Sequence, residues 1–460
     1  MVILRQPVYQ TVGRIQPAPG SVIAKVISVA LGKDTGLVRQ HNRAIVLELL
    51  RTQGPLSRPA VARRGGLSRP TVIEITGDLI QEGLLREVGY GPSTGGRRPV
   101  LLELASEAQW SIGVRIGLRE ITGVITDLHA TVHQRRETPY HMREGPHIFL
   151  ARVEEVLTDL IRTAPDGWRS VRGIGVALPA PVLMIGPLTV WSAHYPVWDG
   201  FRIKEALAAA YSVPVLVDNN ANTAALGEHF FGAGQGAQQM LYVLISQGIG
   251  GGVIVNGEIY RGAAGGAGEI GHATIDFDGP RCSCGRHGCL GVYASAAAIV
   301  RRARQALVLA GRPALGGGDD DDLVIDDVID AALAGDELAI GVLEEAGRYL
   351  GIGLANAIHC YDPGLIVLGG PAARAGQLLL APAVASARQQ LLPGMGERAR
   401  IMLGQLGEDA EAIGAAVLPL RDLFRVVVPE EVDLAGPRQS RSTQEVNTAD
   451  TASVASAAGD

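Results

Sequence analysis

The sequence predicts an α/β protein in which a small basic head of three helices and a hairpin precedes a larger acidic body. Three helical patterns follow one another between residues 40 and 83, and a hairpin pattern continues to residue 104. Beyond Trp110, short β-rich runs alternate with helical patterns, which is typical of an α/β body. The charge changes at the same boundary, because residues 37–100 carry ten arginines against five acidic residues whereas residues 101–460 carry −14.

Length and composition indicate several domains. The 460 residues exceed one ordinary domain of about 100–200 residues, and 47% hydrophobic with 4% aromatic residues is a globular composition. A single small module and a wholly disordered chain are therefore excluded. We expect a poorly ordered extension over 1–36, unless its start codon is misplaced, a head over 37–105, a body over 106–435 and a disordered tail over 436–460.

No segment is predicted to enter a membrane. The longest charge-free apolar stretch, from Gly173 to Trp191, contains Pro179, Pro181 and Pro187 and cannot form one lipid-spanning helix. The N-terminus lacks the compact apolar region of a secretory signal. Only four cysteines occur, three of them within eight positions, which fits a reducing compartment. We therefore expect a cytoplasmic protein.

The three helices of the head each have a start or stop signal. The first pattern runs from Gln40 with the spacing of an amphipathic helix and stops before Gly54. In the second, Ser57 can cap the helix and Pro59 suits its first turn. The third begins at Ser68 and runs to Gly83. Three short helices in about forty residues form a tri-helical helix-turn-helix unit.

Two short strand patterns around a glycine-rich basic tip follow the third helix and complete a winged helix-turn-helix. Side chains at the N-terminal end of the third helix can reach base edges and phosphates, and arginines in the tip can enter a narrow minor groove. An alternative is that the unit packs for stability alone. The predicted DNA contacts are Arg39, Arg43, Ser57, Arg58, Ser68, Arg69, Thr71, Arg97 and Arg98.

The strands of the body are expected where the β-rich runs lie. A flexible acidic loop is predicted from Gly316 to Asp322, and Cys360 is predicted to be a core residue rather than a ligand. No tandem repeat is visible. The predicted strands cover Ile112 to Val114, Ile121 to Asp127, Ile174 to Leu178, Val213 to Val217 and Leu241 to Ile245.

One imidazole and three thiols fall within eighteen residues and predict a zinc site. The ligands are His272, Cys282, Cys284 and Cys289, a complete tetrahedral Cys3His set that leaves no open position for water. The predicted cofactor is therefore a structural Zn²⁺. The alternative is three loop cysteines without a metal.

Several motifs resemble the ROK family of repressors, open reading frames and sugar kinases. They are Gly268-Glu269-Ile270-Gly271-His272, the cysteine segment from Cys282 to Cys289, Gly248-Ile249-Gly250-Gly251-Gly252, Leu178-Pro179-Ala180-Pro181-Val182, Asp218-Asn219-Asn220-Ala221-Asn222 and Ile366-Val367-Leu368-Gly369-Gly370. The resemblance runs from about Gln40 to Phe424, and the head resembles that of the family's regulator branch. It implies a two-lobed, actin-like ATPase fold of the ribonuclease H type, with a sugar held between the lobes.

The resemblance also implies that catalysis is lost. The general base of the family's kinases is an Asp, and its position here is Asn220, which cannot accept a proton. The first phosphate loop carries Arg115 and Arg119 in place of an Asp and a Thr. The second presents Ser246-Gln247 in place of Gly-Thr and keeps only a phosphate-loop remnant at Gly248, Gly250 and Gly251. We therefore predict no kinase activity.

Sugar contacts do not need that base, because amides bind hydroxyl groups as carboxylates do. The resemblance places Asn219, Glu269 and His272 in a hydroxyl-binding set, which Asn220 could join. A further family carboxylate is replaced by Gly291, and a pocket glycine by Ala180. The alternative for Asn219 and Glu269 is a structural hydrogen bond.

The sequence thus predicts a DNA-binding transcriptional regulator, most simply a repressor, that senses a sugar or sugar derivative. Its expected partners are double-stranded operator DNA, the sugar and further copies of the chain in a homodimer or homotetramer. Ligand binding is expected to close the lobes and to shift helices near 340–360 and 410–424. Two alternatives stay open: a sugar kinase with residual activity through another base such as Asp218, and a ligand-independent regulator with a zinc-braced body.

Overall fold

A computed structural model describes residues 35–92, 98–179, 182–183, 189–190, 196–198, 200–317, 323–395 and 398–424. Most of the predicted extension, the predicted tail, Arg97, Ala180 and most of the acidic loop lie outside these residues. The first helix begins at Thr35, five residues before the predicted Gln40 and inside the stretch expected to be poorly ordered.

The head contains the three predicted helices, α2 (Thr35–Gln53), α3 (Arg58–Gly65) and α4 (Arg69–Gln81). Ser57 accepts a hydrogen bond from the backbone N–H of Ala60, as predicted for a cap, and Ser68, at the predicted start of the third helix, accepts one from that of Thr71. The predicted hairpin is β2 (Leu85–Tyr90) with β3 (Val100–Leu104), and a short strand that was not predicted, β1 (Leu56–Ser57), pairs with β3. The fold of the head is therefore a winged helix-turn-helix.

The body is built on two five-stranded sheets with the same topology. The first has the order β10-β7-β4-β5-β6 and the second the order β13-β12-β11-β14-β15, each with an antiparallel meander followed by two parallel strands. The duplication is structural, since no repeat is visible in the sequence. The strands are β4 (Trp110–Ile116), β5 (Glu120–Thr126), β6 (Val132–Pro139), β7 (Val171–Leu178), β10 (Val215–Asn219), β11 (Gln239–Ile245), β12 (Ile249–Val255), β13 (Glu258–Ile259), β14 (Leu365–Gly369) and β15 (Arg400–Leu403).

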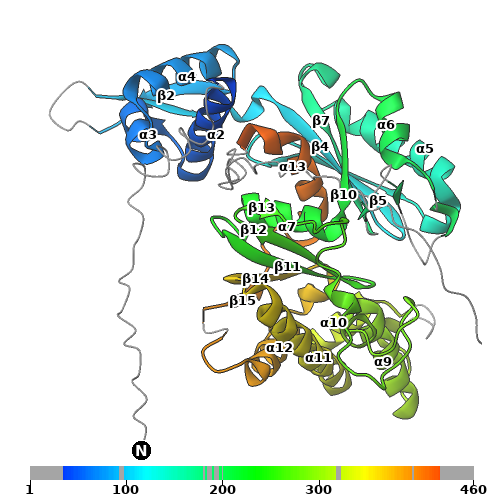
Figure 1. Cartoon of the computed structure of the whole chain (residues 1–460). Helices are drawn as coiled ribbons and strands as arrows, with labels where there is room; N and C mark the ends of the chain where they lie inside the picture. Colours follow the sequence, from blue (N-terminus) through cyan, green and yellow to red (C-terminus); the bar gives the residue numbers. More distant parts are fainter. Residues whose placement is uncertain are drawn as a thin grey trace, which may run out of the picture.

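Helices cover both faces of each sheet (Figure 1). A small pair of strands, β8 (Val182–Leu183) and β9 (Thr189–Val190), lies outside the two sheets. The helices are α5 (Gly145–Ile161), α6 (Ile203–Ala210), α7 (Asn220–Phe231), α8 (Gly291–Ala294), α9 (Ala296–Leu309), α10 (Ile325–Leu333), α11 (Glu337–Tyr361), α12 (Gln377–Gln390) and α13 (Ala410–Phe424).

Two helices, α7 and α13, lie between the sheets and pack against each other. The helix α13 packs on β4 and β7, and α7 packs on β11 and β12. Contact is close, since a Cβ on Gly175 of β7 would lie 1.8 Å from the carbonyl oxygen of Ala415. The outer face of the second sheet packs on α9 to α12 in a separate core cluster. This arrangement confirms the two-lobed, actin-like fold.

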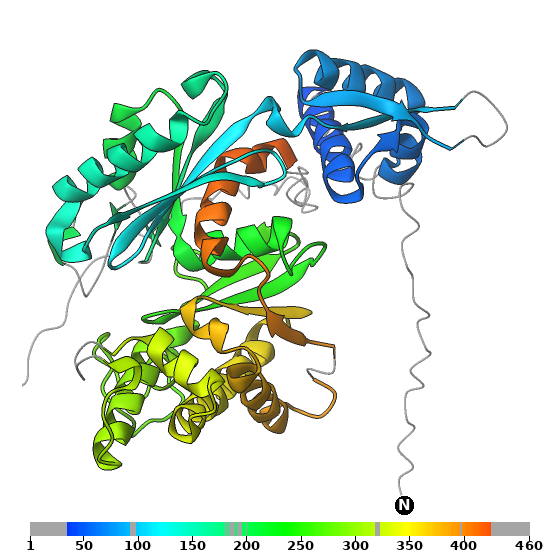
Figure 2. The same cartoon turned by 180° about the vertical axis from the view of Figure 1, so that it is seen from behind.

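The head rests on the ends of the two central helices. Figure 2 shows it beside the C-terminal end of α13, and buried residues of the head share one apolar cluster with Phe230 of α7 and Phe424 of α13. Arg51 of α2 donates to the carbonyl oxygen of Phe230 at 2.5 Å. Within the described residues, no helix is both long and apolar enough to span a membrane.

Candidate functional site

The helix α4 presents its N-terminal end at the surface of the head. Ser68 and Arg69 are exposed and Thr71 is half-buried. The hydroxyl groups of Ser68 and Thr71 lie 2.7 Å apart and form a hydrogen bond at the helix cap. The Arg69 side chain takes no part in this bond. Among the residues that the structure describes, Arg69 has no ion-pair partner.

Two of the predicted DNA contacts instead neutralise acidic side chains of the head. Arg39 of α2 forms ion pairs with Glu74 and Asp78 of α4, and Arg43 pairs with Glu82 just beyond it. The hydrogen bond from Arg43 lowers the pKa of Glu82. The arginines therefore remove negative charge from one side of α4, which would otherwise repel a phosphate backbone.

The remaining predicted DNA contacts divide between the second helix and the wing. Arg58 donates to Thr76 at 3.0 Å and pairs with Glu87 at 3.1 Å, and Ser57 serves as the cap of α3. Arg98, at the base of the wing, is exposed. Arg97 lies outside the described residues.

The four predicted metal ligands come together. Their ligand atoms all lie within 4.8 Å of one another. Sγ of Cys284 is 3.7 Å from Sγ of Cys289, and Sγ of Cys282 is 3.7 Å from Nδ1 of His272. Two ligands bound tetrahedrally at about 2.3 Å from a zinc ion lie about 3.8 Å apart. The four residues could therefore hold a metal ion such as zinc.

The surroundings of the cluster act differently on two of its thiols, since burial raises the pKa of Cys289 to about 12 whereas the pKa of Cys284 is lowered. Hydrogen bonds from the backbone and side chain of Arg286 help to lower the pKa of Cys284 to about 6, which favours the thiolate form that binds metals. Burial raises the pKa of the neighbouring Glu269. Cys360 is exposed near the end of α11, so its prediction as a core residue was wrong: the helix ends one residue later, at Tyr361.

The predicted sugar residues Asn219 and Asn220 lie where β10 ends and α7 begins. Oδ1 of Asn219 accepts from the backbone N–H of Ala221 at 2.8 Å and caps α7. Asp218, the alternative base, is buried and forms an ion pair with Arg261 and a 2.9 Å hydrogen bond with Asn222. Its carboxylate is therefore already occupied.

His272 ends a short 3₁₀ turn (Ile270–His272) that Glu269 directly precedes, and this segment approaches β12 from the opposite face to α7. In β12, a Cβ on Gly252 would lie 2.4 Å from the carbonyl oxygen of Ala221 in α7, and a Cβ on Gly251 would lie 2.8 Å from that of Gly268. The structure thus places the two halves of the predicted sugar set on either side of one strand. Gly248 lies in the turn before this strand, and Gly250 faces α7. Close approach of α7 and of the Gly268 carbonyl oxygen therefore accounts for Gly250, Gly251 and Gly252, whereas a Cβ on Gly248 would meet no atom within 4 Å.

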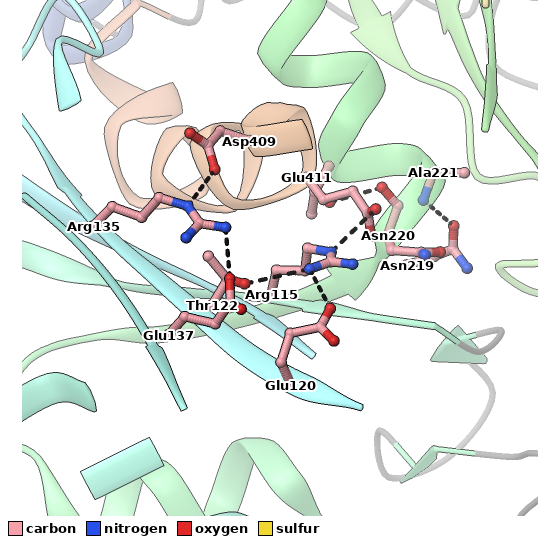
Figure 3. A network of polar contacts seen from close by, with 11 residues as sticks. Arg115, Glu120, Thr122, Arg135, Glu137, Asn219, Asn220, Ala221, Asp409 and Glu411 are labelled. Atoms are coloured by element: carbon pink, nitrogen blue, oxygen red, sulfur yellow. Dashed lines mark hydrogen bonds and ion pairs between the residues drawn. The ribbon is translucent and has the colours of Figure 1, made fainter. Parts of the chain in front are cut away.

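A buried network of polar side chains includes Asn220 and lies between β4 and the two central helices, α7 and α13 (Figure 3). The Asn220 side chain forms a hydrogen bond with Glu411 of α13, and Nε of Arg115 lies 3.4 Å from Oε1 of the same carboxylate. Arg115 also pairs with Glu120 at 2.9 Å and donates to Thr122 at 3.3 Å. Burial raises the pKa of Glu411 although Arg115 and Asn220 lower it.

A second ion pair ties the first sheet to the start of α13. Nε of Arg135, on β6, donates to Asp409 at 3.0 Å, and its Nη2 donates to Glu137 at 2.7 Å (Figure 3). Arg51, Glu411 and Asp409 were not predicted from the sequence. No local spacing could have found these partners, because Arg115 and Glu411 are 296 positions apart.

The fold and these sites define a class of protein: a winged helix-turn-helix head on a two-lobed actin-like body with a cysteine and histidine cluster. A family model for the ROK family matches residues 111–422. The chain belongs to the ROK family.

Curated relatives of the chain include repressors that match nearly their full length. A xylose repressor of Bacillus spizizenii is 30% identical over 86% of this chain and 98% of its own. The DNA-binding transcriptional dual regulator NagC of Escherichia coli is 32% identical over 85% of this chain and 95% of its own. Over most of its length, head included, the chain is thus similar to ROK transcriptional repressors.

Solved structures of the family agree. A ROK transcriptional regulator homologous to the E. coli MLC protein has 27% identity and a TM-score of 0.70 over 84% of this chain and 97% of its own. A ROK glucokinase of Streptomyces griseus, with glucose and AMPPNP bound, has 31% identity and a TM-score of 0.59. It covers only 68% of this chain but 99% of its own.

Proposed function

We propose that this chain is a sugar-responsive transcriptional repressor that binds operator DNA through its winged helix-turn-helix head. The observation that carries the proposal is the continuous match to repressors across both head and body. The head also carries ten arginines against five acidic residues in 37–100, and three of those acids are paired on or just after α4.

We propose that DNA binds one face of the head, which is formed by the N-terminal end of α4 and the wing. Arg69, Ser68 and Thr71 approach the major groove at the N-terminal end of α4, and Arg98 lies at the base of the wing. Arg97, which is outside the described residues, is a further proposed contact. Arg39, Arg43 and Arg58 support this face by pairing with acidic residues, and Ser57 by capping α3. Any contacts of Arg39, Arg43 and Arg58 with phosphate are then secondary to the contacts made by the N-terminal end of α4 and by the wing.

The body senses a sugar or sugar derivative. Two curated relatives are named for different sugars, the xylose repressor of Bacillus spizizenii and an N-acetylglucosamine repressor of Escherichia coli that is 32% identical to this chain. These names indicate the chemical class of the ligand and not its identity. Asn219, Asn220, Glu269 and His272 are the proposed contacts. The body forms a homodimer or homotetramer, which would match a two-fold operator, and the protein works in the cytoplasm.

Sugar binding in the body would reach the head through α7. This helix begins at Asn219 and Asn220 and spans about 18 Å for its twelve residues, and its far end holds Arg51 of the head. A rotation of α7 and α13 on lobe closure would therefore move the two heads relative to each other.

Catalysis is not part of the proposed function. Arg115 stands where the family resemblance puts the metal-holding Asp of the first phosphate loop and forms an ion pair with Glu411. The Asn220 side chain binds the same carboxylate in place of acting as a base. In the cluster at His272, Zn²⁺ has a structural role, because four protein ligands leave no open position.

The test is a fluorescence anisotropy titration of the full-length protein on DNA fragments that flank its gene. We expect specific binding that weakens steeply with salt. Arg69→Ala should weaken it and lower the salt slope by about one, whereas Arg162→Ala, which removes an exposed arginine on the body, should not. Equal binding to all fragments and by both variants would contradict the proposal.

A further inference from the structure

The exposed face of α4 carries one large apolar side chain, Ile73. Its exposed fraction is 60%, whereas Val72, Ile75 and Leu79 of the same helix are buried in the core of the head. Ile73 lies four residues after Arg69 and four before Gly77, so all three positions share one face of the helix. The face therefore presents an arginine, then an isoleucine, then a position without a side chain.

The surroundings of Ile73 leave it open to a large partner. A Cβ on Gly77 would meet no atom within 4 Å, so nothing at the next turn shields the isoleucine. The neighbouring carboxylates of Glu74 and Asp78 are both paired with Arg39. A polyanion can thus approach this face without meeting unpaired negative charge.

The major groove offers one apolar group that such a side chain could recognise. Among the four bases only thymine carries a 5-methyl group there, and apolar side chains contact it directly. We propose that Ile73 contacts the 5-methyl group of a thymine in the bound operator and thereby specifies an A·T pair at that position. This inference rests on the proposed function, since it requires α4 to lie in the major groove.

An isoleucine can also be exposed for two simpler reasons, and the same experiment distinguishes them from DNA contact. Single apolar residues on a surface are common and need no function, and a second copy of the head could cover Ile73. Neither of these makes DNA affinity depend on a base methyl group.

The experiment uses the full-length protein and duplexes that it selects from a randomised library. Each thymine of the selected site is replaced in turn by deoxyuridine, which removes only the methyl group, and affinities are measured for wild type, Ile73→Ala and Leu309→Ala. Leu309 is 88% exposed on α9 and serves as the matched control. Thermal unfolding checks that each variant is folded.

We expect one thymine position at which deoxyuridine weakens wild-type binding about fourfold, the effect of one buried methyl group. At that position Ile73→Ala should bind the two duplexes equally, and Leu309→Ala should behave as wild type. Either no methyl dependence at any position or an unchanged dependence in Ile73→Ala would overturn the inference. If selection enriches no sequence at all, the DNA-binding function itself fails, which is a different result.

Discussion

Nε of Arg115 and Oε1 of Glu411 lie 3.4 Å apart, between the strand that begins the first lobe and the helix that ends the described chain. Neither side chain is more than 19% exposed. Asn220, at the start of the other central helix, binds the same carboxylate. One buried network therefore joins β4, α7 and α13, the three elements that meet between the lobes.

Breaking this network should destabilise the body. Arg115→Met leaves Glu411 buried without its cation, so we expect the free energy of unfolding at neutral pH to fall by about 3–5 kcal/mol. Urea denaturation measures the change. Adding Glu411→Gln should restore part of the loss because it removes the unpaired charge. A single Arg115→Met variant as stable as wild type would contradict this account.

Asn220→Asp should not create a kinase. It supplies a carboxylate at the position implied for the base, but Arg115 still stands at the position implied for the metal-holding Asp, so the gain of about 10²–10⁴-fold that a base typically gives should be absent. A coupled ATP hydrolysis assay with a panel of sugars measures it.

The same substitution should lower stability, because it places a second carboxylate beside Glu411. The loss should shrink as the pH falls, since Glu411, whose pKa is raised by burial, then takes up a proton. Melting temperatures at pH 5 and pH 8 would show this difference.

In the activity assay of Asn220→Asp, sugar-dependent ATP hydrolysis above the wild-type level would contradict the first of these two predictions and favour the kinase alternative.

Arg51 is expected to fasten the head to the body. Its guanidinium donates to the Phe230 carbonyl oxygen and lies 4.9 Å from the centre of the Phe230 ring and 5.7 Å from that of Phe424. Arg51→Ala should weaken this contact by about 2–4 kcal/mol and speed hydrogen exchange in α2, with α11 as the internal control. Arg51→Lys keeps the charge but not the planar group. Unchanged exchange in α2 of Arg51→Ala would show that other contacts hold the head.

His229 should make stability depend on pH near this contact. Burial and the charge of Arg51 lower its pKa from 6.5, so in the native state it stays neutral when the unfolded chain has already bound a proton. Wild type should therefore lose stability relative to His229→Gln as the pH falls below about 6.5, and the difference should be constant above it. Denaturation midpoints between pH 5 and pH 8 test this, and a difference independent of pH would contradict it.

Metal removal should unfold the region around His272. We expect about one zinc per chain, lost in Cys289→Ser together with a lower melting temperature, because a structural metal contributes directly to folding. Elemental analysis gives the zinc content. Cys360→Ser is the control, since that thiol is exposed and outside the cluster. Wild-type protein purified without zinc would contradict the assignment.

The parts of the fold that the sequence predicts well depend on local signals. Ser57 and Ser68 are each followed two residues later by a proline, and these caps fixed two helix starts. The cysteine spacing predicted a cluster that the structure assembles around His272. In such cases neighbouring residues in the sequence are also neighbours in space.

The rest depends on contacts between distant segments. The ion pair of Arg115 with Glu411 and the contact of Arg51 with Phe230 join residues far apart in the chain, so no spacing reveals them. Arg39 and Arg43 illustrate the same limit, because their acidic partners on and after α4 are known only once α2 is packed against it. The two sheets share one topology, but the sequence shows no visible repeat, so this duplication could not be predicted either.

The most direct test of sugar-controlled DNA binding adds sugars to a preformed complex of full-length protein and operator. Fluorescence anisotropy would be followed with a panel of pentoses, hexoses, N-acetylhexosamines and their phosphates at fixed salt. We predict that one compound releases the DNA, and that Asn219→Ala reduces this response while leaving DNA affinity unchanged. Specific DNA binding that no compound alters would contradict sugar sensing and favour a ligand-independent regulator.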